Sequence, residues 1–310
     1  MPSILSVTAL RTALEVGMVY SLVAIALFIS FSILNIADLS TDGCYTLGFA
    51  VGATMTLAGH PFLALPAAMA AGACSGFVLA FLQTRLGVES ILAGIIVNTG
   101  LYTVNLAVMG WSANLSIFGC DSIFTVAKAL SSAAWWQKWH ELVVLAVILL
   151  IVALAVAFFF HTRLGLSIRA TGDNPDMVRS SSINPAFTIT VGLCLANSLT
   201  GLAGCLIGML NKSCDINLGT GMVTIALASL IIGEGIMRKA SIPLRILGVI
   251  LGACLYRLII AVAINTSLVP TECFKLISAL IVAIACVTPQ GKKLLSLQLR
   301  KLALRKKGGA

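Results

Sequence analysis

Residues 10–34, LRTALEVGMVYSLVAIALFISFSIL, form an apolar stretch in which Arg11 and Glu15 are the only charged residues. The hydrocarbon core of a bilayer is about 30 Å thick, so a helix that crosses it needs about 20 mostly apolar residues. The stretch is longer than this and continues to Asn35 without a signal-peptide cleavage pattern. We therefore expect a retained transmembrane helix rather than a secretory leader.

The composition extends this expectation to the whole chain. Hydrophobic residues make up 59% of the 310 residues and charged residues only 10%, and the mean hydropathy is +1.05. A soluble domain carries about 25% charged residues, so lipid must cover much of the surface. The net charge of +9 lies mainly at the ends of apolar stretches and in the C-terminal tail. This placement favours membrane orientation over nucleic-acid binding.

Apolar stretches recur between polar segments and predict an all-α, polytopic membrane helical bundle of about eight to ten transmembrane segments. The stretch 43–58 is short, which is typical of a half-helix or a broken span. The nine stretches are 10–34, 43–58, 62–86, 90–109, 141–161, 186–210, 219–237, 241–264 and 272–289.

Lysine and arginine residues predict the orientation, because cytoplasmic loops carry an excess of them. Arg163, Arg169 and Arg179 lie in the central polar segment 162–185, and seven further basic residues lie in the tail 290–310. We expect both segments, and hence the C-terminus, on the cytoplasmic side.

The two halves of the chain show weak similarity to each other. A shift of 176 positions superposes Leu34, Asn35 and Gly43 on Leu210, Asn211 and Gly219. Because the predicted crossings of the two halves run in opposite directions, this pattern predicts an inverted-topology repeat. We expect one transmembrane domain, 1–310, made of a first repeat 10–109, a connecting helix 141–161, a cytoplasmic loop 162–185, a second repeat 186–289 and a basic tail 290–310.

The polar segment NIADLSTDG, residues 35–43, interrupts the apolar pattern between the first two stretches and contains Asp38 and Asp42. Unwound backbone is tolerated at membrane depth where it lines a cavity. Two interpretations remain open: a break that lines a translocation path with both carboxylates, or a solvated loop between helices.

Three further polar side chains are candidates for the path. Asn98 and Asn197 fall near the middle of their predicted spans, where an amide needs a hydrogen-bonding partner. That partner is another helix, a water or a solute, and we take as a hypothesis that both side chains face the solute path. Glu234 lies four residues before Arg238, so a simple i,i+4 ion pair is the alternative to a role in the path.

The segment 161–185 is a long polar insertion between apolar stretches. Asp173 or Asn174 is suited to cap a short helix that has Pro175 at its first position and Asp176 in its first turn. A docking site for another protein and an ordinary capped loop are both compatible with these residues.

Motifs for catalysis are absent from the sequence, which contains no phosphate-binding P-loop, no H-E-x-x-H, no G-x-S-x-G and no metal-spaced set of cysteines and histidines. We expect no enzyme activity, no metal and no cofactor in this chain. Most of the nine cysteines lie in apolar stretches as packing residues; Cys120, Cys214 and Cys273 lie in predicted outer loops, where a disulfide is an alternative. Four G-x-x-x-G pairs predict close helix packing: Gly48/Gly52, Gly72/Gly76, Gly204/Gly208 and Gly248/Gly252.

Three runs of sequence resemble a known family. They are MVYSLVAIALFISFSILNIADLSTDGCYTLGFAVGA (18–53), ESILAGIIVNTGLYTVNLAVMG (89–110) and INLGTGMVTIALASLIIGEGI (216–236). They resemble the permease subunits of bacterial ABC importers of the branched-chain amino acid and ribose type, and within that group those linked with tryptophan and tyrosine uptake. The similarity extends over nearly the whole chain.

The resemblance implies partners and a location. Such permeases pair with a second copy or a sister permease, bind two cytoplasmic ATPase subunits that hold ATP and magnesium, and receive the solute from an extracytoplasmic solute-binding protein. The implied location is the bacterial cytoplasmic membrane, and the implied function is ATP-driven import of a small solute, with an aromatic amino acid favoured. An ion-gradient-driven secondary transporter is the alternative; it needs a central carboxylate or ion cage, and acidic residues are sparse.

In such permeases a short cytoplasmic coupling helix docks into each ATPase. The matching stretch here is 169–182, and the expected coupling residues are Arg169, Ala170, Thr171, Gly172, Asp173, Asn174, Pro175 and Asp176. The chain departs from the family pattern after the N-P pair, where Asp176, Met177 and Ser180–Ser182 replace small alanine or glycine residues.

Overall fold

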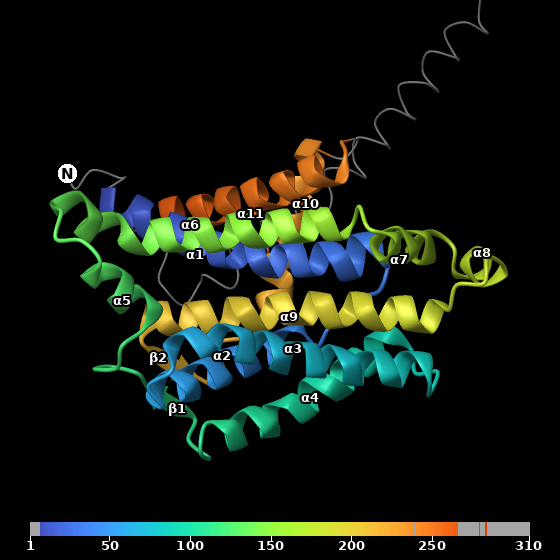
Figure 1. Cartoon of the computed structure of the whole chain (residues 1–310), viewed down its shortest axis with the longest axis horizontal. Helices are drawn as coiled ribbons and strands as arrows, with labels where there is room; N and C mark the ends of the chain where they lie inside the picture. Colours follow the sequence, from blue (N-terminus) through green and yellow to red (C-terminus); the bar gives the residue numbers. More distant parts are fainter. Residues whose placement is uncertain (1–6, 238–239, 266–278, 280–282, 284–310) are drawn as a thin grey trace, which may run out of the picture.

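The computed structural model describes residues 7–237, 240–265, 279 and 283, and these are mainly helical (Figure 1). The first apolar stretch forms α1 (Val7–Leu27), which continues directly into a π-helix, η1 (Phe28–Ile33). The following elements are α2 (Thr41–Leu57), α3 (Pro61–Thr84), α4 (Ser90–Val108), β1 (Asn114–Ser116), α5 (Ile123–Ala129), α6 (Ala134–Phe159), α7 (Arg163–Asp173), α8 (Pro175–Ser180), α9 (Pro185–Asn211), β2 (Ser213–Asp215), α10 (Met222–Met237) and α11 (Ile242–Asn265).

Six of the described helices are long and apolar enough to cross a membrane: α1 with η1, α3, α4, α6, α9 and α11. This confirms the predicted membrane helical bundle. The predicted stretches 43–58 and 219–237 become α2 and α10, which have only 17 and 16 residues, or about 25 Å at 1.5 Å per residue. Apart from residues 279 and 283, the predicted stretch 272–289 and the basic tail lie outside the described residues.

The long helices lie side by side along one axis (Figure 1). α1 runs from the N-terminus toward α7, and α9 runs the opposite way, from α8 toward β2. α2 and α3 pack against α9, whereas α10 and α11 pack against α1. We call the end that carries α7 and α8 the α8 end. The opposite end, where α5 lies and β1 pairs antiparallel with β2, is called the ribbon end.

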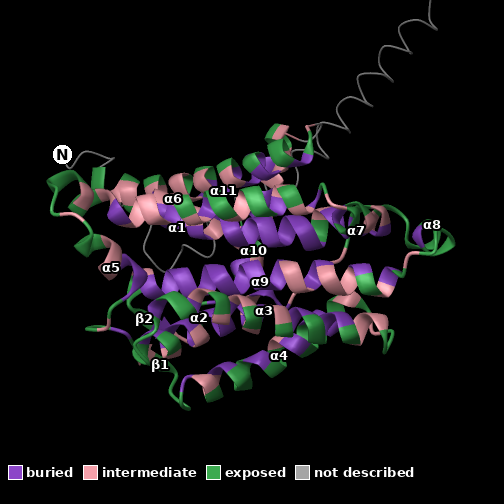
Figure 2. Ribbon diagram, in the orientation of Figure 1, coloured by how far each residue is buried: buried purple, intermediate pink, exposed green. Residues whose placement is uncertain are grey.

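α1 and α9 are the most buried of the long helices, whereas α4 and α6 are largely exposed (Figure 2). The exposed side chains in the middle of α6 are apolar and include Leu150, Ile151 and Leu154. Such a face is suited to contact with lipid tails, which cannot satisfy polar groups.

Glycines allow the inner helices to approach closely. A Cβ atom at Gly48 of α2 would overlap the carbonyl oxygen of Gly201, and one at Gly72 of α3 would overlap that of Asn197. Any side chain at these positions would push α2 or α3 away from α9. The structure thus confirms the packing role predicted for the G-x-x-x-G pairs.

The two short helices begin partway along the bundle rather than at one of its ends. α2 starts beside the middle of α9, where the Cys44 thiol donates a hydrogen bond to the carbonyl oxygen of Asn197 at 3.3 Å. It runs parallel to α9 toward the ribbon end, because its successive glycines meet α9 residues in the same order along the chain. α10 runs toward the α8 end, where Glu234 accepts a hydrogen bond from Ser32 of η1.

Candidate functional site

The polar break between η1 and α2 is buried in the bundle. The side chain of Asp38, only 3% exposed, accepts hydrogen bonds from the Ser40 backbone N–H at 2.8 Å and the Ser40 hydroxyl at 2.6 Å. The hydroxyl oxygen of Ser40 in turn accepts from Nδ2 of Asn197 at 3.4 Å. The break is therefore tied to the middle of α9 and is not a solvated loop.

Asp42, in the first turn of α2, joins the two short helices. Its two carboxylate oxygens accept hydrogen bonds from the backbone N–H groups of Gly221 and Val223, each at 2.9 Å. These groups lie at the start of α10, where unpaired N–H groups and the helix dipole favour a negative charge. The starts of α2 and α10 are thus held together partway along the bundle, as discontinuous helices are at transporter sites.

A cavity of about 240 Å³ opens beside this junction. Its walls come from the start of α2, the middle of α4 and the segment between β2 and α10. The lining residues are mostly polar: Asp42, Gly43, Thr46, Asn98, Thr99, Tyr102, Asn105, Ile216, Asn217 and Thr220. Thr99, Tyr102 and Thr220 are exposed, so the cavity is reachable from outside the chain.

Asn105 is the lining residue that sequence reasoning missed. It is 1% exposed, and its Nδ2 donates to the carbonyl oxygen of Gly43 at 3.1 Å. Its Oδ1 is buried and has no hydrogen-bond partner among the described residues, an arrangement that costs about 1–3 kcal/mol. The available signal was its spacing: seven residues after Asn98, it lies on the same face of α4.

The structure brings four of the five predicted path residues to this junction. Asp42 and Asn98 line the cavity, and Asn98 lies close over α2, because a Cβ atom at Gly43 would be 2.7 Å from its Oδ1. Asp38 and Asn197 lie in the adjoining buried network and are not among the lining residues. A role of these four residues in the solute path stays a prediction.

Glu234, the fifth candidate, lies apart from the cavity near the α8 end. Its carboxylate pairs with Arg245 of α11 at 2.5 Å and accepts from Ser32 of η1. The guanidinium of Arg245 also lies 4.9 Å from the ring centre of Phe28. The predicted partner Arg238 lies outside the described residues. The ion pair of Glu234 with Arg245 joins α10 to α11.

The predicted coupling segment forms α7 and α8. Asn174 is the cap of α8, and its side chain accepts from the backbone N–H groups of Asp176 and Met177, each at 3.1 Å. Pro175 occupies the first position of that helix, as the sequence predicts. Asp173, Asn174, Asp176 and Met177 are all exposed.

The opposite face of the same segment is packed against the bundle. The hydroxyls of Thr171 and Thr188 lie 2.7 Å apart. A Cβ atom at Gly172 would overlap the carbonyl oxygen of Ile33, the last residue of η1. Of the expected coupling residues, Thr171 and Gly172 therefore pack the segment against α9 and η1. Asp173 to Asp176 lie on its exposed face.

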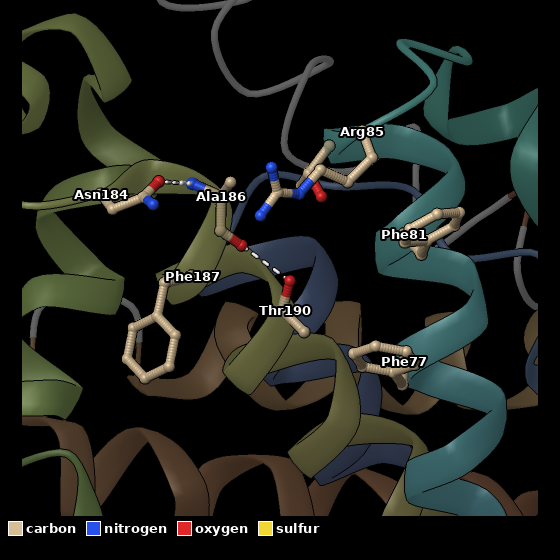
Figure 3. A pocket seen from close by; sticks show the side chains of 8 residues that line it. Phe77, Phe81, Arg85, Asn184, Ala186, Phe187 and Thr190 are labelled. Atoms are coloured by element: carbon tan, nitrogen blue, oxygen red, sulfur yellow. Dashed lines mark hydrogen bonds between the residues drawn. The ribbon is translucent and has the colours of Figure 1, made fainter.

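A second cavity, of about 340 Å³, lies at the α8 end between the last turns of α3 and the first turns of α9 (Figure 3). Phe77, Phe81 and Phe187 make it largely aromatic, and Arg85 is the one charged residue among its described lining residues. On the α9 side of the cavity, the hydroxyl of Thr190 donates to the Ala186 carbonyl oxygen at 2.7 Å. It differs from the polar cavity in both chemistry and position.

The cysteines predicted in outer loops do not pair with each other where the structure describes them. Cys120 and Cys214 are free thiols, and Cys273 lies outside the described residues. Burial raises the pKa of the Cys214 thiol in β2 to about 12, so this thiol is neutral and poorly reactive at physiological pH.

These features define a multi-pass membrane transport protein, with discontinuous helices that meet beside a polar cavity. The chain belongs to the family described as the permease component of the branched-chain amino acid transport system, whose model matches residues 9–286. It is a permease component of an ABC-type transport system, hence a transport subunit and not an enzyme.

Two relatives are similar over most of the chain. A tyrosine transport system permease protein of Clostridioides difficile (strain R20291) is 28% identical over 267 residues, which are 86% of this chain and 86% of that protein. An uncharacterized protein of Rickettsia prowazekii (strain Madrid E) is 33% identical over 227 residues, or 73% of this chain and 77% of that protein. No solved structure matches the chain.

Proposed function

We propose that this chain is the membrane-spanning subunit of an ATP-driven importer that carries an aromatic amino acid across the bacterial cytoplasmic membrane. The family supports the transport role, and the relative named as a tyrosine permease favours an aromatic solute. The junction of α2 and α10 supports alternating access, because two short helices that meet at mid-depth can open toward one side or the other.

The observation that carries the proposal is the construction of the α7–α8 segment. One face offers Asp173, Asp176 and Met177 to a partner, and the other face places Gly172 directly on the end of η1. A cytoplasmic ATPase that grips the exposed face would therefore move the residues just before the buried break. The partners that this mechanism needs are two ATPase subunits with ATP and magnesium, a second permease copy or sister subunit, and an extracytoplasmic solute-binding protein.

Charge supports the orientation in the membrane. Arg163, Arg169 and Arg179 lie on α7 and α8, which by the excess of basic residues belong to the cytoplasmic side. The ribbon end would then face the solute-binding protein, and the C-terminal tail would be cytoplasmic.

Packing supports the inverted repeat. At the predicted shift, α1, α2 and α3 correspond to α9, α10 and α11. The contacts correspond as well: α2 and α3 pack on α9, as α10 and α11 pack on α1. Two halves related in this way can rock against each other around the junction.

The proposal is tested by measuring tyrosine uptake in cells that carry the chain with its ATPase and solute-binding protein. We expect uptake to persist when ion gradients are collapsed and to stop when ATP is depleted. Uptake that follows the ion gradient instead would establish the secondary-transporter alternative.

Coupling is tested with a charge reversal, Asp173→Lys together with Asp176→Lys. These side chains are exposed, so the variant should fold, whereas a bulky residue at Gly172 would disturb η1. We expect at least about tenfold lower uptake, since a docking loss of about 1.4 kcal/mol corresponds to a factor of ten. Uptake by the double variant at the level of the unchanged chain would refute docking at α8.

A further inference from the structure

The polar cavity is rich in hydrogen-bond acceptors and carries a negative charge. Asp42 is the one charged residue among its described lining residues. The hydroxyls of Thr46, Thr99 and Thr220 already donate to backbone carbonyl oxygens, so toward the cavity they act as acceptors. A group that fits such a surface brings donors and a positive charge.

Asn105 adds an acceptor whose direction is fixed. The carbonyl oxygen of Gly43 can only accept, so Nδ2 of Asn105 must face Gly43. Its Oδ1 is left as the end of the amide without a partner among the described residues. A buried unpaired acceptor at the wall of a polar cavity is stabilised by a bound donor.

We propose that this cavity binds the ammonium group of the transported solute, with Oδ1 of Asn105 and the carboxylate of Asp42 as its acceptors. An ammonium group has three donors, no acceptor and a positive charge, which matches this wall. This inference rests on the proposed function and assigns the part of the chain that would hold the amine of its solute.

The remainder of the cavity fits an amino acid. The side chains of Asn98 and Asn217 have no hydrogen bond within the described part of the chain, so their NH₂ groups are free to donate to a carboxylate. The ring of Tyr102 lines the exposed side, where an aromatic side chain can lie against it. The volume, about 240 Å³, is below the range of about 300–1,000 Å³ for drug-sized ligands, so the solute is small.

The test is binding to the purified full-length permease, measured from the thermal unfolding midpoint as a function of probe concentration. The probes are L-tyrosine, tyramine, which lacks the carboxylate, and hydroxyphenylpropionate, which lacks the amine. We expect tyrosine and tyramine to raise the midpoint at millimolar concentration and hydroxyphenylpropionate to leave it unchanged. Equal stabilisation by the deaminated probe, or no stabilisation by either amine, would overturn the proposal.

Asn105→Leu removes the acceptor, together with the hydrogen bond to the Gly43 carbonyl oxygen, with little change in size. We expect it to weaken binding of tyrosine and tyramine about 10- to 100-fold, as for the loss of a hydrogen bond to a charged group. The matched control is Ser75→Ala, because the buried oxygen of Ser75 meets no hydrogen-bond criterion within the described part of the chain and does not line the cavity. Unchanged binding in Asn105→Leu would contradict the assignment.

A second variant keeps the proposal testable if Asn105→Leu does not fold. Thr99 is exposed at the side of the cavity, so Thr99→Trp fills the space without a change in the core. We expect it to abolish stabilisation by both amines, and retained stabilisation would place their site elsewhere.

The binding test needs neither ATP nor the ATPase. Amine binding that depends on Asn105 would stand even if uptake proved to be gradient-driven. Conversely, ATP-driven uptake without amine binding at this cavity would leave the proposed function intact and remove only the inference.

Discussion

Gly48 and Gly100 are both helical glycines in apolar stretches of sequence, but only Gly48 has a close neighbour. A Cβ atom at Gly48 would overlap the Gly201 carbonyl oxygen, whereas one at Gly100 would meet nothing within 4 Å. The G-x-x-x-G spacing predicts that Gly48 packs against a helix. It does not identify α9 as that helix, because spacing defines a face and not its partner.

This difference predicts opposite effects of the same substitution. We expect Gly48→Ala to destabilise the permease by about 1–3 kcal/mol through overpacking against α9. Gly100→Ala should be neutral or gain up to about 1 kcal/mol, since alanine favours a helix over glycine. Unfolding in detergent measures both, and equal stability of the two variants would show that α2 does not approach α9 this closely.

Asp38 and Asp42 show what local sequence can and cannot predict. The partner of Asp38 is Ser40, two residues on, a local arrangement that aspartate favours in turns. The partners of Asp42 are Gly221 and Val223, about 180 residues away. This contact exists only because α2 packs beside α10. The sequence therefore identified Asp42 as a candidate path residue, but it did not predict that Asp42 accepts hydrogen bonds from the start of α10.

The short helix α8 depends on its first residues. With six residues from Pro175 to Ser180, it is too short to be stable through its own hydrogen bonds. Asn174 satisfies two of its N–H groups, and Val178 is buried. The cap and the proline were predicted from sequence because N-cap preferences are local.

Asn174→Ala should therefore loosen α8 alone. The loss of an N-cap costs about 1 kcal/mol, which corresponds to roughly fivefold faster amide exchange in residues 175–181 if they exchange by local opening. Hydrogen exchange with mass spectrometry measures this change. The matched control is Asn184→Ala, which removes the cap of α9 at Ala186; exchange in α8 that is unchanged by Asn174→Ala would contradict the cap.

The π-helix η1 was not predicted from sequence. Residues 28–33, FISFSI, are apolar with two serines and fit a continued α-helix equally well. The wider turn of a π-helix is not encoded by these residues alone. The end of η1 contacts α7 and α9, and Ser32 accepts a hydrogen bond from Arg245. Such contacts come from remote parts of the chain and leave no local signal.

At the scale of the whole molecule, two sequence patterns predicted the long helices and one of the short ones. Apolar stretches predicted the long helices because lipid imposes a minimum length, and the shortness of 43–58 predicted a half-helix or a broken span, which α2 matches in length. The sequence did not predict the start of α6 at Ala134, because Gln137, Lys138 and His140 interrupt the apolar pattern before the predicted stretch 141–161. The antiparallel pair of β1 and β2 was likewise not predicted, as three-residue strands lack a detectable alternation.

The two ends of the bundle should be reachable from opposite sides of the membrane. In a chain without its native cysteines, we expect Met177→Cys to react with a membrane-impermeant thiol reagent only in inside-out vesicles. Ser132→Cys, between α5 and α6, should react in intact cells. Both native side chains are exposed, so only the membrane would keep the reagent from either cysteine. Labelling of Met177→Cys in intact cells would contradict the proposed topology.

At Gly172, backbone lies directly on backbone. No side chain lies between Gly172 of α7 and the carbonyl oxygen of Ile33. Asp38 lies five residues after Ile33 in the sequence. Where side chains separate two helices, they can change rotamer when one helix shifts slightly, so the other helix need not move. Two main chains in direct contact cannot adjust in this way. In the proposed mechanism, a displacement of α7 by a docked ATPase would therefore be passed to the backbone of η1, five residues before Asp38.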